Sequence, residues 1–173
     1  EKEEREGQEG KETQGTQGAR QTFAGRHPGD GPAVVACVDH FWTLRRPVDW
    51  AELKDYCYHV ASTVGLACTH IWQASNTMPR QAAIDCGIAF QLTNILRDVA
   101  TDAQQGRIYI PHCEFERFNV SPVLWLQGNP DGDWSGLIQS VAAHAELLYC
   151  TGWETMQFLP APGQRVFSLM WRY

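Results

Sequence analysis

The sequence is short of positive charge. Its 14 Lys and Arg residues stand against 20 Asp and Glu residues, which leaves a net charge of −6. Nucleic acids and anionic membrane surfaces attract basic proteins, so this balance excludes a general binder of either, and no nucleic-acid partner is expected. If the protein handles phosphates, metal ions must neutralise their charge.

Long apolar runs and closely spaced cysteines are also missing. No stretch approaches the roughly 20 apolar residues of a membrane-spanning helix, and no apolar signal segment is visible. We therefore predict a cytoplasmic protein. The cysteines form no C-x-x-C pair, which argues against a zinc site or a disulfide scaffold and favours buried, reduced thiols. They are Cys37, Cys57, Cys68, Cys86, Cys113 and Cys150.

The two ends differ from the middle of the chain. Residues 1–32 contain seven glycines and only three hydrophobic residues, so they cannot offset their chain entropy by burial, and we predict a disordered low-complexity tail. A last helix would start at Pro162 and stop at Tyr173 without a glycine cap. We expect residues 33–173 to form a partial helical domain, incomplete at both ends.

Hydrophobic spacing predicts helices over 50–72, 80–104 and 133–158. Asp49 followed by Glu52 resembles a capping box, Asp133 is the expected N-cap of the third helix, and Gly106 is the expected stop of the second. Residues 107–111 read as extended, with short helical turns after Pro111 and near 121–122. No strand pattern appears, so the predicted class is all-α.

The first of these helices has two distinct faces. A strip of small residues, Ala61, Ser62 and Gly65, would let another helix approach closely. Beside it, spacing at 100° per residue predicts one larger face, made of Tyr56, Val60, Thr63, Val64, Ala67 and Ile71.

The helix over 80–104 carries a polar stripe made of Gln91, Asn94, Asp98 and Asp102, opposite an apolar side. Two aspartates four residues apart repel each other, at a cost that grows inside a bundle unless a cation lies between them. Carboxylate oxygens with room for water suit Mg²⁺. Two interpretations stay open: a solvated polar face, and a Mg²⁺ site on an interior helix face.

Two segments resemble the signatures of the squalene and phytoene synthase family. Residues 56–65, YCYHVASTVG, are similar to its Y-C-x-x-V-A-G/S-x-V-G signature. Residues 87–102 have the pattern G-x-x-x-Q-x-x-N-I-L-R-D-V-x-x-D, and GRIYIP follows at 106–111; together they resemble the second signature. The resemblance covers about 45–173. Cys86 departs from the aliphatic residue usual before the glycine.

This resemblance implies an isoprenoid synthase-type helical bundle and the head-to-head condensation of two prenyl diphosphates, farnesyl or geranylgeranyl. The product would be squalene, dehydrosqualene or phytoene, in isoprenoid, carotenoid or hopanoid biosynthesis. Mg²⁺ would be the cofactor, and NADPH would be needed only for squalene. Because the product is a long hydrocarbon, the family analogy also implies peripheral membrane association.

The resemblance also assigns roles to individual residues. Tyr56 would assist the carbocation steps; alternatively, it is only a packing residue of the core. Arg97 would form a structural ion pair or, alternatively, bind diphosphate. The implied catalytic residues are Tyr56, Asp98 and Asp102. The implied Mg²⁺ ligands are Asp98, Asp102 and Asn94. The implied substrate-binding residues are Val60, Val64, Gln91, Asn94, Arg107 and Tyr109.

The family's first Asp-rich motif, D-x-x-x-D, has no match in residues 1–55, where no two aspartates are four apart. We therefore expect this chain, read as a fragment of such a synthase, to be catalytically weak or inactive. One alternative is a non-catalytic paralogue that binds prenyl diphosphates or a partner protein. A purely structural all-α protein is the third reading.

Overall fold

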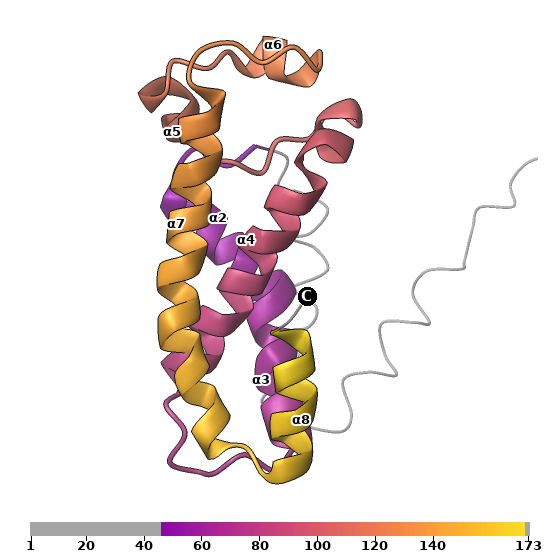
Figure 1. Cartoon of the computed structure of the whole chain (residues 1–173), viewed down its shortest axis with the longest axis vertical. Coiled ribbons are helices and arrows are strands. Elements are labelled where there is room, and N and C mark those ends of the chain that lie inside the picture. Colours follow the sequence, from indigo (N-terminus) through magenta and orange to yellow (C-terminus); the bar gives the residue numbers. More distant parts are fainter. Residues whose placement is uncertain (1–45, 172–173) are drawn as a thin grey trace, which may run out of the picture. The chain divides into compact units, whose positions relative to one another are not determined.

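A computed structural model describes residues 46–171, and every regular element in that range is helical. The predicted tail over 1–32 and the start of the predicted domain lie outside the described residues. Figure 1 shows the arrangement. The elements are α2 (Trp50–Cys57), the π-helical turn η1 (Tyr58–Ser62), α3 (Thr63–Ile71), α4 (Arg80–Gln104), α5 (His112–Arg117), α6 (Pro122–Leu126), α7 (Trp134–Gly152), the 3-10 helix η2 (Trp153–Phe158) and α8 (Ala161–Met170).

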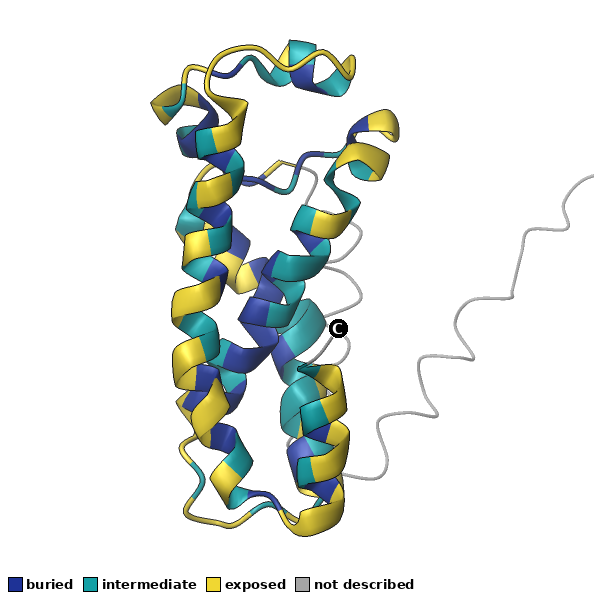
Figure 2. Ribbon diagram, in the orientation of Figure 1, coloured by how far each residue is buried: buried dark blue, intermediate teal, exposed yellow. Residues whose placement is uncertain are grey.

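The long helix α4 is the central element, and α7 packs against it along one side of the molecule (Figure 1). Leu92 of α4 and Val141 of α7 are fully buried in the main hydrophobic core. Near the end of α7 the two backbones approach closely. A Cβ placed on Gly152 would lie only 2.8 Å from Cα of Cys86, so only glycine fits there. Figure 2 shows buried residues along the facing sides of these helices and exposed residues on their outer sides.

The predicted strip of small residues is confirmed as the contact with α4. The Ser62 hydroxyl donates a hydrogen bond to the carbonyl oxygen of Ile84 at 2.8 Å. A Cβ on Gly87 would lie only 2.5 Å from Cα of Ser62, so the helices can cross this closely only with glycine there. Gly65 faces the same helix, with the carbonyl oxygen of Ala83 3.9 Å from its Cβ position.

The predicted larger face of helix 50–72 is wrong beyond its middle. Tyr56 is buried, but Ala67 is exposed and Ile71 is 76% exposed, while Ser62 and Thr69 are buried instead. The reason is the π-helical turn, in which the N–H of Thr63 bonds to the carbonyl of Tyr58, five residues back. This wider turn inserts about one extra residue and rotates everything after it by about 100°.

The other predicted boundaries are largely confirmed. Helix α4 has the predicted bounds, and the Asp49 and Asp133 side chains cap α2 and α7 by accepting backbone N–H bonds. The predicted third helix ends early, because α7 stops at Gly152 and continues as the 3-10 helix η2. Helix α8 begins at Ala161, one residue before the predicted start.

The cysteine prediction is confirmed only in part. All five cysteines of the described segment are free, and Cys57 and Cys86 are buried, but Cys150 is exposed. No helix within residues 46–171 combines the length and hydrophobicity needed to cross a membrane.

Candidate functional site

The predicted polar stripe lies along α4 with its members on one side of the helix. At the end of the stripe nearer the start of α4, the Asn94 side-chain amide donates to Oε1 of Gln91 at 3.4 Å, so these two side chains are neighbours. Further along, Asp98 is 46% exposed and Asp102 is 16% exposed. The stripe therefore runs from a half-buried amide pair to one open carboxylate and one sheltered carboxylate.

Asp98 is paired with the adjacent arginine. Arg97 donates from Nε to Oδ1 at 2.8 Å and from Nη2 to Oδ2 at 2.7 Å, a bidentate pair. The hydrogen bond from Arg97 holds the pKa of the Asp98 carboxyl below its usual value. Both side chains are largely exposed, so the pair contributes little to stability. This is an ion pair of the kind considered for Arg97 from the sequence.

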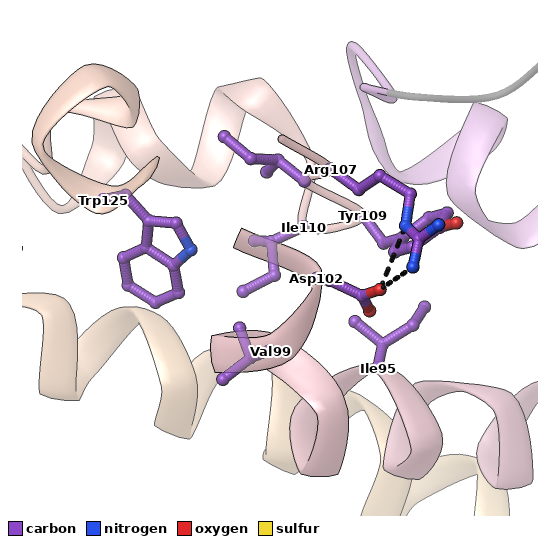
Figure 3. A pocket seen from close by; sticks show the side chains of 8 residues that line it. Ile95, Val99, Asp102, Arg107, Tyr109, Ile110 and Trp125 are labelled. Atoms are coloured by element: carbon purple, nitrogen blue, oxygen red, sulfur yellow. Dashed lines mark hydrogen bonds and ion pairs between the residues drawn. The ribbon is translucent and has the colours of Figure 1, made fainter. Parts of the chain in front are cut away.

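Asp102 is paired with Arg107, which comes from beyond the end of the helix. The Arg107 Nε and Nη2 atoms both donate to Oδ1 of Asp102, at 3.1 and 3.0 Å (Figure 3). Nη2 also donates to Oε1 of Gln105. The sequence motifs assigned both charged residues to the site but did not predict that they pair with each other.

The end of α4 explains this pairing. Gly106 has a φ of 73°, a left-handed conformation that favours glycine. The N–H of Gly106 bonds to the carbonyl of Ala103, and the N–H of Arg107 bonds to the carbonyl of Asp102, each at 2.9 Å. Together these two bonds form a Schellman motif. The chain therefore turns back at Gly106 and returns Arg107 to the turn that carries Asp102.

Tyr56 and Tyr109 come together although they are 53 positions apart in sequence (109 − 56). Their rings stack with centroids 5.3 Å apart and planes 18° apart. Burial, followed by the neighbouring Tyr109, raises the pKa of Tyr56 well above its ordinary value, so its hydroxyl stays neutral at physiological pH. A neutral, buried phenol beside a second aromatic ring is suited to contact with an apolar or cationic group.

A cavity of about 10 Å³ lies against Asp102, Arg107 and Tyr109 (Figure 3). This volume is at the lower limit for holding one water molecule. The remaining walls are apolar: Ile95, Val99, Ile108, Ile110 and Trp125. Trp125, from α6, was missed by sequence reasoning, because no motif links that short helix to the end of α4.

A much larger pocket, of about 260 Å³, lies between α3, α4 and α8. Four predicted substrate-binding residues line it: Val60, Val64, Gln91 and Asn94. Most of its other walls are apolar and were not predicted, including Trp72, Phe90, Phe167 and Met170. Residues of α8 could not be placed there from sequence, because only the folded chain brings that helix beside α3. The pocket thus has amide groups at one end and apolar walls beyond.

The donor set of the stripe fits a hard cation in part. Asp98, Asp102 and Asn94 offer carboxylate and amide oxygens, the kind of ligand Mg²⁺ prefers, with open space for water beside Asp98. No group of three His, Cys, Asp or Glu side chains gathers as a metal cluster within residues 46–171. A cation held here would therefore need two carboxylates together with non-protein ligands.

Comparison with known sequences matches the squalene/phytoene synthase family model to residues 32–173. The chain is 43% identical to the 15-cis-phytoene synthase of Synechocystis sp. over 100 residues, which cover 51% of this chain and 30% of that protein. It is 33% identical to phytoene synthase 2 of Zea mays over 135 residues, which cover 74% of this chain and 34% of the relative. The chain thus spans about a third of these relatives.

Two solved structures share the fold. A dehydrosqualene synthase in complex with ligand has a TM-score of 0.72 and 27% identity, over 81% of this chain and 50% of that one. Squalene synthase HpnC from Alicyclobacillus acidocaldarius has a TM-score of 0.75 at 20% identity, over 82% of this chain and 54% of that one, and this likeness concerns the fold alone. With an all-α isoprenoid synthase fold and a family match over residues 32–173, the chain belongs to the squalene/phytoene synthase family.

Proposed function

We propose that this chain is part of a Mg²⁺-dependent enzyme that condenses two prenyl diphosphates head to head, giving phytoene, dehydrosqualene or squalene. The observation that carries the proposal is the stripe of α4, whose amide end lines the 260 Å³ apolar pocket and whose other end carries two carboxylates. Such a site can hold a hydrocarbon chain and a charged head group at once. The family membership and the phytoene synthase relatives agree with it.

In this proposal the predicted site residues divide into those that hold the cation, those that bind diphosphate and one that faces the carbocation. Asp98, Asp102 and Asn94 would hold Mg²⁺, which supplies Lewis-acid assistance to diphosphate departure. Arg107 would bind diphosphate oxygens, Tyr109 would close over them, and the Tyr56 ring would face the carbocation.

The pocket supplies the apolar part of the proposed reaction. Val60 and Val64 would contact the prenyl chain and exclude water, which would otherwise capture the carbocation. Gln91, at the amide end, would lie between this wall and the metal–diphosphate group. A reductant such as NADPH would be needed only if the product is squalene.

The first test measures Mg²⁺-dependent binding of farnesyl thiodiphosphate, a non-reacting analogue, through the rise in melting temperature that binding causes. Wild-type protein should melt at a higher temperature with Mg²⁺ and analogue together. Asp98→Asn and Asp102→Asn should lose this shift, because the carboxylates no longer hold the cation. Glu146→Gln, an exposed change on α7, is the control and should keep it. An unchanged shift in both aspartate variants would rule out the proposed metal site.

Turnover separates the two candidate functions. A non-catalytic prenyl-diphosphate-binding protein is favoured by one observation: each stripe carboxylate is already neutralised by an arginine. We further propose that the 173-residue chain turns over slowly or not at all, since residues 1–55 contain no two aspartates four apart. Hydrocarbon formation from farnesyl or geranylgeranyl diphosphate at an ordinary enzymatic rate would contradict this.

Cytoplasmic location with peripheral membrane association is part of the same proposal.

A further inference from the structure

The two arginine–aspartate pairs of the stripe differ in shelter. Arg97 and Asp98 are adjacent in sequence and 66% and 46% exposed, so water and salt screen their attraction. Asp102 is only 16% exposed, and Arg107 contacts it through two nitrogen atoms. The Asp102–Arg107 pair is therefore the one whose separation leaves a poorly solvated carboxylate.

The backbone also holds Arg107 in place. Its own N–H bonds to the carbonyl of Asp102, and its guanidinium reaches Gln105 as well as the Asp102 carboxylate. The positive φ of Gly106 allows this return of the chain. The helix cap thus brings the guanidinium to Asp102.

The charges of these two pairs sum to zero in this structure. Asp98 and Asp102 contribute two negative charges, and Arg97 and Arg107 contribute two positive charges. A divalent cation arriving alone meets a carboxylate already neutralised by Arg107. A diphosphate arriving alone meets a guanidinium already engaged by Asp102. Each ligand would release the group that the other one needs.

We propose that Arg107 is an internal counter-ion for Asp102, whose positive charge weakens the binding of a divalent cation by that carboxylate until the guanidinium moves away. Diphosphate accepts the hydrogen bonds of the departing guanidinium, so cation and diphosphate bind cooperatively, and the coupling is the same in either order. In this proposal Arg107 has two effects: it binds the diphosphate and it releases Asp102. This inference rests on the proposed function, since it assumes that the stripe binds both ligands.

Calorimetric titration with Mg²⁺ alone tests the counter-ion directly. Arg107→Gln and Arg97→Gln each remove one positive charge from the stripe, so their general electrostatic effects match, and the difference between them isolates the sheltered pair. Arg107→Gln should bind Mg²⁺ about fivefold or more tightly than wild type. Arg97→Gln should change the affinity by less than about twofold. Arg107→Lys keeps the charge and should stay near wild type.

A second measurement uses the wild-type protein and needs no variant. Inorganic pyrophosphate and Mg²⁺ together should raise its melting temperature by more than the sum of their separate shifts. In Arg107→Gln the excess over that sum should be smaller than in wild type, because the guanidinium no longer couples the two ligands. Helical circular dichroism of each variant establishes that it is folded before either comparison.

The outcomes distinguish a failure of the counter-ion proposal from a failure of the proposed function. Equal Mg²⁺ affinities in Arg107→Gln and Arg97→Gln, with additive shifts in wild type, would overturn the counter-ion and leave the metal site standing. An absence of Mg²⁺ and pyrophosphate binding in all variants and in wild type would overturn the proposed function, and this inference with it.

Discussion

Glu114 is a buried carboxylate that ties three helices together outside the candidate site. It is 4% exposed, accepts a hydrogen bond from Nε1 of Trp50 at 3.0 Å and one from the Ser140 hydroxyl at 2.7 Å, and lies 3.6 Å from a guanidinium nitrogen of Arg117. Burial favours the protonated form, but these partners outweigh it and lower the pKa of Glu114. Its charged form is therefore stabilised by folding.

This lowered pKa predicts a pH dependence of stability. A carboxylate whose pKa is lower in the folded state stabilises the protein above its unfolded pKa, and this contribution is lost as the pH falls through the folded pKa. The free energy of unfolding should thus decrease below about pH 4.5. Glu114→Gln should cost about 1–3 kcal/mol at pH 7 and make urea unfolding less sensitive to pH between 5 and 3. An equally steep pH profile in this variant would contradict the assignment.

At the scale of elements, the cap of α4 depends on one backbone conformation. Gly106 has a φ of 73° and open space around its Cβ position, so replacing it by alanine costs only backbone strain. Gly106→Ala should lower the free energy of unfolding by about 1 kcal/mol and also loosen Arg107 from Asp102. Gly128→Ala is a matched control, because Gly128 has a φ of 72° and the same open surroundings.

Denaturant melts and Mg²⁺ titrations of the two variants separate the effects. Both should lose similar stability, but only Gly106→Ala should change Mg²⁺ affinity. Identical Mg²⁺ affinities would show that the cap does not hold the guanidinium in place.

The crossing of η1 with α4 gives a second element-scale prediction. A methyl group on Gly87 would lie 2.5 Å from the Ser62 backbone, which cannot move aside without separating the helices. Gly87→Ala should therefore lower the free energy of unfolding by about 2 kcal/mol or more, as measured by denaturation with guanidinium chloride. Gly65→Ala is the control, since its nearest neighbour is 3.9 Å away and alanine favours the helix. Equal stability of the two variants would contradict this packing.

At the scale of the whole molecule, thiol reactivity reports how well the bundle excludes solvent. Burial raises the pKa values of Cys57 and Cys86 to about 12, whereas Cys150 is exposed. Little reactive thiolate exists at the two buried sites near pH 8. Peptide mapping after brief treatment with a thiol reagent should find Cys150 modified, and the buried pair modified only in denaturant. Rapid native labelling of Cys86 would contradict its burial in the folded protein.

Local signals in the sequence sufficed for most helices and for the stripe. Helix spacing alone aligns Gln91, Asn94, Asp98 and Asp102, and capping side chains mark where α2 and α7 begin. The Arg107–Asp102 pair was missed although its signal was present. Gly106, two residues past the end of α4, predicts a Schellman cap, and that cap returns the next residue to the last turn.

Spacing and short motifs within single helices were enough to predict the helical class, the family and the polar stripe. The buried side of α3 depends instead on contacts between helices, since the π-helical turn there accompanies contacts between Ser62 and α4. The pocket walls from α8 and the stacking of Tyr56 on Tyr109 likewise depend on the folded chain. Such contacts join residues far apart in the chain, and their energies depend on distances that no local pattern encodes.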